Sequence, residues 1–330
     1  MVSLNTKEEV HVNVFCQPKG WLKENLKVHY DKIKLPGIRV STSIRPLAEA
    51  DAWVALRPSE ASDRNDLKKT VICLTHALHK AESYRPGGYR SAVNQAGALI
   101  LSHPEIRKRL TAAHINLEDK LVMERPMGAS IRYQPGSSLP SEFTLGWFGR
   151  GIWPNRPEWM VRVCRELSAN IGTFKVLLVG SELEQTHKML EDHDLTVDYL
   201  KRKDYSPGAY PEWYQQLNCM VITGVHNTLQ VPLFEALASG IPVVGTPVGY
   251  AEEFAAQHPQ AVQVSDVPDQ ICQSLIEVYE QRQHLFDERA NIAQLMEAWS
   301  LDDWMFTTLR MAVRLSGKLG SSMTNSMAFG

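Results

Sequence analysis

The stretch from Val231 to Glu253 holds the residue whose position is most suggestive of chemistry, Glu235. We expect this carboxylate to open a helix that ends at Gly240, where a positive φ is accessible, and that feeds a buried strand at 241–244. Such a layout places Glu235 at the mouth of a parallel sheet, where α/β proteins bind their ligands. A glutamate at a helix start is otherwise favoured only by the helix dipole, by ~0.3–1 kcal/mol.

The elements that would position this residue repeat along the whole chain. Apolar runs alternate with polar helical stretches, a pattern typical of parallel sheets covered by helices. In the first half, the predicted strands are residues 11–16, 38–42, 52–56, 71–75, 98–102 and 120–124, and the predicted helices are 21–33, 89–95 and 105–113. In the second half, the predicted strands are 144–148, 175–179, 220–223 and 241–244, and the predicted helices are 158–169, 211–217 and the Glu235 helix.

Two Rossmann-like α/β domains with a cleft between them follow from this order. We predict a short, basic first domain at 1–140 and a second domain at 141–298, with a linker at 134–140. The last part, 299–330, is predicted to be a helix from about Leu301 to Leu315 followed by a flexible tail.

The net charge of −2 conceals a difference between the halves. Residues 1–140 hold 21 Lys and Arg against 14 Asp and Glu, whereas residues 141–330 hold 14 against 23. This asymmetry indicates an anionic partner for the first half, although two solvated surfaces could differ this way by chance.

The five cysteines are scattered and show no metal-ligand spacing, which is typical of reduced core thiols. No window approaches the ~18 apolar residues of a membrane helix, and no secretory signal opens the sequence. We therefore expect a cytoplasmic protein, with peripheral attachment to a membrane left open.

The second half also resembles a known family. Glu235 is followed in register by Ala-Leu-Ala-Ser-Gly-Ile-Pro-Val-Val, and Gly146-Trp-Phe-Gly-Arg150 precedes Arg156 by six residues. This string is similar to the sugar-nucleotide signature of GT-B glycosyltransferases, especially the retaining, glycogen-synthase-like family four. The resemblance implies a GT-B fold in which the C-terminal helix crosses back onto the first domain.

The resemblance implies roles for residues of the second domain. Arg150, together with Arg156 in place of the family's lysine, would bind the donor diphosphate. Glu235 matches the second glutamate of the family's Glu-x7-Glu motif and would accept hydrogen bonds from the donor ribose. The first glutamate is replaced by Asn227, which loses the charge and adds two donors. Asn227 and Thr228 would still touch the sugar.

Other residues are weaker candidates. Gly249 would let the backbone approach the donor. In the first domain His76, at a strand end, matches a family histidine beside the transferred sugar, and Gly20 lies in the loop that faces the donor. Four basic residues near predicted strand ends would hold the acceptor, although each alone is more often solvated: Lys19, Arg57, Arg85 and Arg90.

The resemblance therefore implies a glycosyltransferase that uses a UDP- or GDP-type sugar nucleotide, with no metal and no further cofactor. An anionic acceptor fits the basic half, either hydroxymethylated DNA of a virus, in the host cytoplasm, or a lipid-linked or polysaccharide glycan. A non-catalytic GT-B protein that only binds the sugar nucleotide, or serves as a scaffold, is the alternative that Asn227 favours. A nicotinamide oxidoreductase is disfavoured because no Gly-x-Gly-x-x-Gly follows the first strand.

Overall fold

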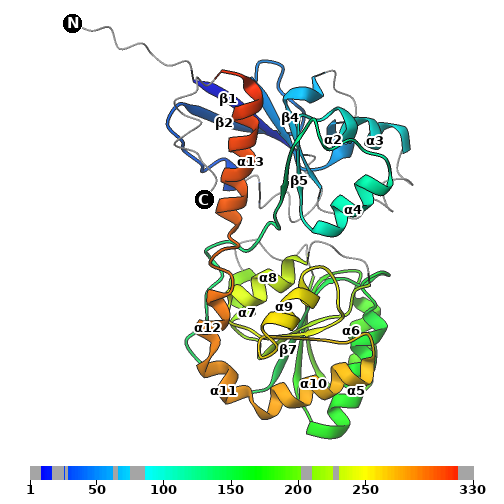
Figure 1. Cartoon of the computed structure of the whole chain (residues 1–330). Coiled ribbons are helices and arrows are strands. Elements are labelled where there is room, and N and C mark those ends of the chain that lie inside the picture. The colour runs from blue at the N-terminus through cyan, green and yellow to red at the C-terminus, as the bar shows by residue number, and fades with distance from the viewer. Residues whose placement is uncertain are drawn as a thin grey trace, which may run out of the picture. The chain divides into compact units, whose positions relative to one another are not determined.

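The chain folds into two compact units, each built around one six-stranded sheet (Figure 1). The computed structural model describes residues 9–16, 26, 29–61, 66–74, 86–201, 210–225 and 230–318, without the side chains of residues 86–88. The first unit comprises residues 1–126 and 303–330, and the second comprises residues 127–302. This division differs from the predicted linker at 134–140, because residues 127–133 pack on the second unit.

All strands of the first sheet run parallel, in the order β2-β1-β3-β4-β5-β6. They are β1 (Val10–Phe15), β2 (Ile38–Ser43), β3 (Ala52–Ala55), β4 (Thr70–Leu74), β5 (Ala98–Leu101) and β6 (Leu121–Glu124). Strands β3, β4 and β5 are buried along their whole length, which is why they appear in the sequence as apolar runs. Each predicted strand of this half is confirmed, with ends that differ by at most one residue.

Short helices connect these strands. They are α2 (Pro58–Ala61), the 3-10 turn Leu67–Lys69, α3 (Pro86–Gln95) and α4 (Pro104–Ala112). Helix α4 begins after His103, whose ring accepts a hydrogen bond from the Glu105 amide, and has Pro104 in its first turn. An apolar core lies between these helices and the sheet, with Phe15, Ile72 and Leu99 fully buried in it.

The last helix, α13 (Leu301–Ser316), packs on the first unit, as the GT-B resemblance predicted. The Thr308 hydroxyl lies 2.5 Å from the hydroxyl of the fully buried Tyr30. A Cβ added at Gly97 would come within 2.9 Å of the Leu315 side chain, so the helix approaches the sheet connection closely. Beyond the helix, Lys318 forms an ion pair of 2.8 Å with Asp51.

The second sheet is also parallel, in the order β12-β11-β10-β7-β8-β9. Its strands are β7 (Thr144–Arg150), β8 (Lys175–Ser181), β9 (Thr196–Lys201), β10 (Cys219–Ile222), β11 (Val243–Gly245) and β12 (Val262–Val264). This is the Rossmann order. Strands β7 to β9 are added toward one edge of the sheet and strands β10 to β12 toward the other, so the strand order reverses between β7 and β10. Strands β9 and β12 were not predicted; β9 is a half-exposed edge strand without an apolar run.

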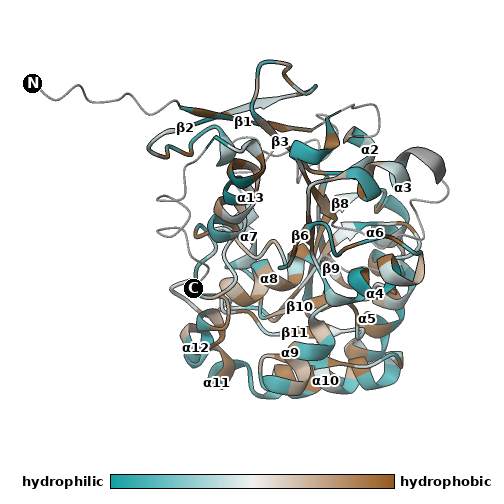
Figure 2. Ribbon diagram, turned by 45° about the horizontal axis from the view of Figure 1, so that its top comes forward, coloured by the Kyte–Doolittle hydropathy of each residue, from teal (hydrophilic) through white to brown (hydrophobic). Residues whose placement is uncertain are grey.

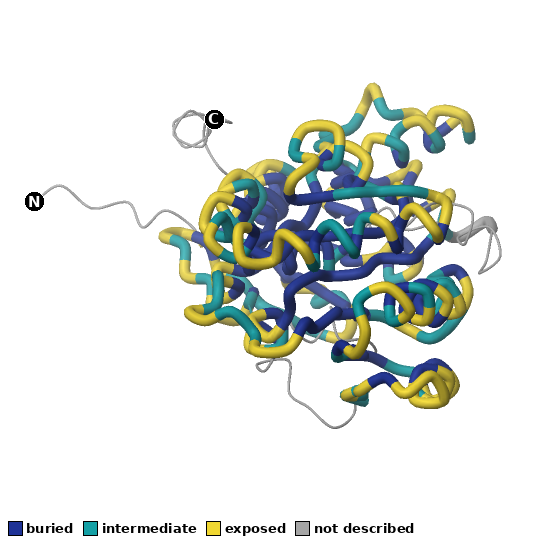
Figure 3. The backbone as a smooth tube through the Cα atoms, turned by 90° about the horizontal axis from the view of Figure 1, so that it is seen from below, coloured by how far each residue is buried: buried dark blue, intermediate teal, exposed yellow. Residues whose placement is uncertain are grey.

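Eight helices of the second unit lie among the described residues. They are α5 (Pro157–Ile171), α6 (Glu184–Glu191), α7 (Tyr210–Tyr214), α8 (Val231–Ala238), α9 (Ala251–Gln257), α10 (Pro268–Glu280), α11 (Arg282–Asp287) and α12 (Arg289–Gln294). Hydrophobic residues gather on the strands in Figure 2, and Figure 3 shows buried stretches of backbone bordered by exposed ones, in agreement with the buried core of this unit. The sheet is thus covered as the sequence pattern predicted.

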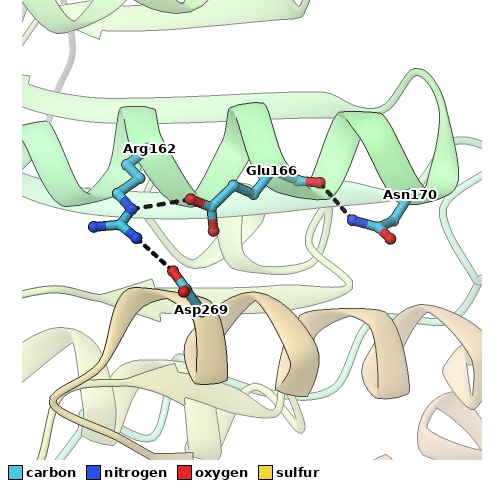
Figure 4. Close-up of polar contacts among 4 residues, drawn as sticks. All are labelled: Arg162, Glu166, Asn170 and Asp269. Atoms are coloured by element: carbon cyan, nitrogen blue, oxygen red, sulfur yellow. Dashed lines mark hydrogen bonds and ion pairs between the residues drawn. The ribbon is translucent and has the colours of Figure 1, made fainter.

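Helices α5 and α10 pack side by side and are bridged at the surface by Arg162 (Figure 4). Its guanidinium donates to Glu166 on its own helix at 2.9 Å and to Asp269 on α10 at 2.5 Å. Below this bridge, Val163 and Cys164 of α5 and Leu275 of α10 are buried in the core. The apolar contact, rather than the solvated ion pairs, is expected to supply most of the stabilisation.

Two connecting segments lie beside each other on the second unit. Residues 127–133, here called the connector, pair with residues 299–301 through the Ala129 and Leu301 amides. Gly128 has a φ of 67°, and a Cβ there would lie 2.0 Å from the Trp299 carbonyl oxygen, so this approach requires glycine. The Trp299 ring stacks on Phe234 of α8 at 5.9 Å, which fixes both segments against that helix.

Among the described residues, no helix has the length and apolarity needed to cross a bilayer. All five cysteines are free and buried, as expected for core thiols. Burial raises the pKa of Cys272 to about 11, so this thiol stays protonated at neutral pH.

Candidate functional site

The crevice where the strand order of the second sheet reverses, between β7 and β10, is the expected place for a ligand in such a sheet. The loop after β7, residues 150–156, is tied to the end of β10. The Thr223 hydroxyl donates to the Asn155 carbonyl at 2.6 Å and accepts from the Trp147 indole at 2.9 Å. The Val225 amide donates to the Pro154 carbonyl at 3.0 Å. These hydrogen bonds anchor the loop after β7 to the end of β10, across the crevice.

Arg150 ends β7 and is exposed. Its guanidinium forms an ion pair of 3.2 Å with Glu182, which follows β8 and adopts a φ of 62°. The two strand ends meet closely, since a Cβ at Gly151 would lie 1.7 Å from the Glu182 carbonyl oxygen. The side chains of this pair are 59% and 55% exposed, so an anionic ligand can replace the glutamate at small cost.

Arg156 stands in the left-handed region, with a φ of 51°, directly before α5. Its guanidinium lies 4.2 Å from the centre of the Trp159 ring, a cation–π contact that orients it. No ion pair to Arg156 is found among the described residues. The loop therefore presents two permanently charged guanidinium groups at the carboxyl edge of the sheet, as a phosphate site requires.

Glu235 lies in α8, but not where the sequence suggested. We expected the carboxylate to open the helix, whereas α8 starts at Val231 and Glu235 belongs to its second turn. The helix starts earlier because Pro232 is favourable in a first turn. Stabilisation by the helix dipole therefore does not explain this carboxylate. Gly240 does leave the helix with a positive φ, 71°, as predicted.

The Glu235 carboxylate is 4% exposed, and both of its oxygens are already bonded. The Tyr133 hydroxyl, from the connector, donates to Oε1 at 2.5 Å. The Tyr214 hydroxyl, from α7, donates to Oε2 at 2.7 Å. Burial raises the pKa of Glu235 to about 8, although the two tyrosine hydrogen bonds pull it down. The pKa of each tyrosine is raised well above its usual value, chiefly by burial and then by the neighbouring carboxylate.

Aromatic rings surround this triad of Tyr133, Glu235 and Tyr214. The Tyr133 and Tyr214 rings meet edge to face at 5.4 Å, and Tyr214 lies 4.6 Å from Phe148 of β7. Sequence reasoning found the glutamate and missed both tyrosines. Tyr133 is 102 positions from its partner, and no motif marks it.

The other predicted residues are placed as follows. Gly249 is half-buried with a φ of 55°, so its loop uses the conformation that glycine permits. Arg57 is exposed after β3. Arg90 is exposed and donates to the Ala113 carbonyl at 2.7 Å, which ties it to the end of α4. Six predicted site residues lie outside the described residues: Lys19, Gly20, His76, Arg85, Asn227 and Thr228.

Comparison with known proteins agrees with this geometry. Residues 142–281 match the family described as "Glycosyl transferases group 1", which covers the second sheet and the loops described above. A search of curated protein sequences gives no match for the chain.

Solved structures resemble the whole fold at low identity. A variant of S. aureus TarM, in complex with fondaparinux, α-GlcNAc-glycerol and UDP, is 13% identical, with a TM-score of 0.64 over 81% of this chain and 56% of that one. Anabaena HepE, in complex with UDP and glucose, is 13% identical, with a TM-score of 0.66 over 95% and 100%. Sucrose-phosphate synthase from Thermosynechococcus elongatus is 10% identical, with a TM-score of 0.67 over 92% and 97%.

The chain spans little more than half the length of TarM and of the pneumococcal transferase GtfA. Two parallel sheets with interleaved helices, as in these solved structures, define the GT-B fold. The match to the group 1 glycosyltransferase family covers residues 142–281, which lie within the second unit.

Proposed function

We propose that the protein transfers a sugar from a UDP- or GDP-type sugar nucleotide to an acceptor held by its first unit. The observation that carries this proposal is the pair of arginines at the crevice between β7 and β10. Arg150 is held by an exposed ion pair with Glu182, and Arg156 is oriented by its contact with Trp159. The structures of TarM and HepE that share this fold contain UDP, which supports the choice of donor.

The proposed chemistry rests on the leaving group. As the bond between sugar and diphosphate breaks, negative charge grows on the diphosphate oxygens, and two fixed guanidinium groups stabilise it. Arg150 would already have exchanged Glu182 for phosphate when the donor bound. We propose transfer with retention and without a metal or other cofactor, with His76, Gly20, Asn227, Thr228 and Gly249 in the roles that the family resemblance implies.

For the acceptor, we propose an anionic molecule. The excess of basic residues in the first 140 positions supports it. Hydroxymethylated DNA and a lipid-linked or polysaccharide glycan fit equally well, and Arg57 is the one predicted acceptor residue that is exposed without a recorded partner among the described residues. Binding of duplex DNA at low salt, compared with anionic vesicles, separates the two. Action in the cytoplasm, free or at a membrane surface, is part of this proposal.

A second candidate function is donor binding without transfer. The occupied carboxylate of Glu235 and the replacement at Asn227 favour it. Hydrolysis of the donor in the absence of any acceptor decides between the two, because an active centre loses some sugar to water whereas a pure binding protein releases none.

The main test is Arg150→Ala, with Arg165→Ala on the exposed side of α5 as the matched control. Loss of one group that stabilises the transition-state charge costs about 100-fold or more in turnover. We expect this loss for Arg150→Ala and none for the control, with unchanged melting temperatures for both. Near-normal turnover of Arg150→Ala would refute the diphosphate role.

A further inference from the structure

The Glu235 carboxylate is closed to any ligand in the conformation described. It is 4% exposed, and the hydroxyls of Tyr133 and Tyr214 each occupy one oxygen. A ligand hydroxyl can reach either oxygen only if one tyrosine moves. The carboxylate is therefore a site whose access depends on a neighbouring side chain.

The two tyrosines differ in how firmly they are held. Tyr214 is fully buried within α7, and its ring packs against Phe148 of β7. Tyr133 is 9% exposed and belongs to the connector, outside any helix or strand. Its neighbours Ile131 and Arg132 are exposed, Ile131 to 73%, so between Ser130 and Tyr133 the Tyr133 ring supplies the apolar packing of this turn. Tyr133 is the side chain that can leave at the lower cost.

We propose that Tyr133 is a positioning residue that keeps the Glu235 carboxylate closed and yields its place there to the ribose hydroxyls of the donor. The exchange balances chemically, because one hydroxyl donor to Oε1 replaces another, the Tyr133 hydroxyl passes to water, and a proton held by Glu235 passes to solvent. This inference rests on the proposed donor function. It adds that donor binding loosens the connector, which leads directly to the junction of the two units at residues 126–127.

The connector gives this exchange a consequence beyond the site. Tyr133 is joined by its own amide to the Ser130 carbonyl, and Ala129 is joined to Trp299. Release of the Tyr133 side chain therefore frees the turn at 130–133. The remaining part of the connector, residues 127–129, stays in place because Trp299 remains stacked on Phe234. Donor binding and ordering of the connector are therefore coupled, so that each changes the equilibrium of the other.

The test is Tyr133→Phe, which removes the competing hydroxyl and keeps the ring. Tyr279→Phe is the matched control, because that ring packs on Phe143, directly before β7 and therefore at the amino end of the strand, away from the site. Binding of UDP and GDP is measured by calorimetry at pH 7. Removing one competing hydrogen bond is expected to tighten binding by about threefold to tenfold in Tyr133→Phe and to leave the control unchanged.

The outcomes separate the two proposals. If the wild type binds and Tyr133→Phe binds equally or more weakly, the closing role of Tyr133 is refuted while the donor function stands. If neither protein binds a nucleotide, both fall. A merely structural role for Tyr133 predicts a loss of affinity, never a gain.

A second measurement serves if Tyr133→Phe does not fold. In the wild type, exchange of the Tyr133 amide with solvent deuterium is followed by NMR with and without saturating UDP or GDP. We expect the nucleotide to accelerate this exchange, whereas amides of β7 exchange no faster. Slower or unchanged exchange at Tyr133 would overturn the proposal.

Discussion

The arginine side and the glutamate side of the candidate donor site are organised in opposite ways. Arg150 and Arg156 are charged at any working pH and either solvated or stacked on a ring. Glu235 is buried, bonded on both oxygens, and has a pKa of about 8. The arginines can therefore bind a diphosphate at the small cost of the exposed ion pair between Arg150 and Glu182, whereas the glutamate must first lose a buried tyrosine hydrogen bond and a proton. The comparison suggests an order of events in which phosphate is bound first and ribose second.

The largest expected effect comes from removing the glutamate. At pH 6, Glu235→Ala leaves the hydroxyls of Tyr133 and Tyr214 buried without their partner, which costs about 1–3 kcal/mol for each group. We expect the free energy of unfolding, from urea titration, to fall by about 2–6 kcal/mol. Arg150→Ala, by contrast, should change it by less than about 0.5 kcal/mol, because that side chain is exposed. Equal effects of the two substitutions would remove the contrast between the two sides.

The second expected effect is a pH dependence that belongs to the glutamate side alone. The folded protein holds the Glu235 proton up to about pH 8, whereas the unfolded chain releases it near the ordinary value of 4.5. Stability from this group is thus fully present below pH 4.5 and is lost as the pH rises toward 8, by about 1.4 kcal/mol per pH unit at most. Donor binding should change in the opposite direction and tighten through pH 8, since the carboxylate is the better acceptor.

Glu235→Gln checks this pH effect. It should remove the pH dependence of the free energy of unfolding and of donor affinity between pH 5 and 9. Arg165→Ala, on the outer side of α5, should leave both pH dependences unchanged. A wild type whose stability and donor affinity do not respond to pH in this range contradicts a buried, protonated Glu235. The arginines contribute no such dependence, because a guanidinium does not lose its proton.

The two sides also differ in how far the sequence could predict them. Arg150 and Arg156 follow a buried strand at a fixed spacing, so a local pattern places both at the carboxyl edge of the sheet. The partners of Glu235 depend on folding across long separations, 102 positions for Tyr133 and 21 for Tyr214. Tyr133 directly precedes the predicted linker at 134–140, whose Pro, Gly and Ser residues indicate an exposed segment, so the sequence did not indicate that Tyr133 is buried.

Strand prediction shows the same limit. Fully buried strands such as β4 and β5 are almost entirely apolar, and their ends were predicted within one residue. Strand β9, at the sheet edge, alternates exposed with half-buried positions and includes Asp198, which pairs with Lys175 of β8. Its pairing with β8 is a tertiary interaction, and the sequence of a half-exposed strand without an apolar run resembles a loop.

The third expected effect tests whether the arginine side depends on shape as well as charge. Arg156→Lys keeps the positive charge but loses the planar group that stacks on Trp159 at 4.2 Å. We expect affinity for UDP or GDP, whichever binds, to fall about threefold to tenfold, the worth of one oriented contact. Arg165→Lys on the outer side of α5 is the control. Unchanged binding by Arg156→Lys would mean that charge alone matters there.

The smallest expected effect concerns the ion pair that occupies Arg150 before the donor arrives. Glu182→Gln removes the competing carboxylate, and an exposed pair of this kind is worth about 0.2–1 kcal/mol. We expect nucleotide affinity to rise about twofold at low salt and the gain to vanish near 1 M salt, where exposed charges are screened. Glu191→Gln, at the end of α6, makes the same change in net charge and should have no effect. If Glu182→Gln instead weakens binding, the glutamate orients Arg150 rather than competing for it, and the arginine side would need a partner in place just as the glutamate side does.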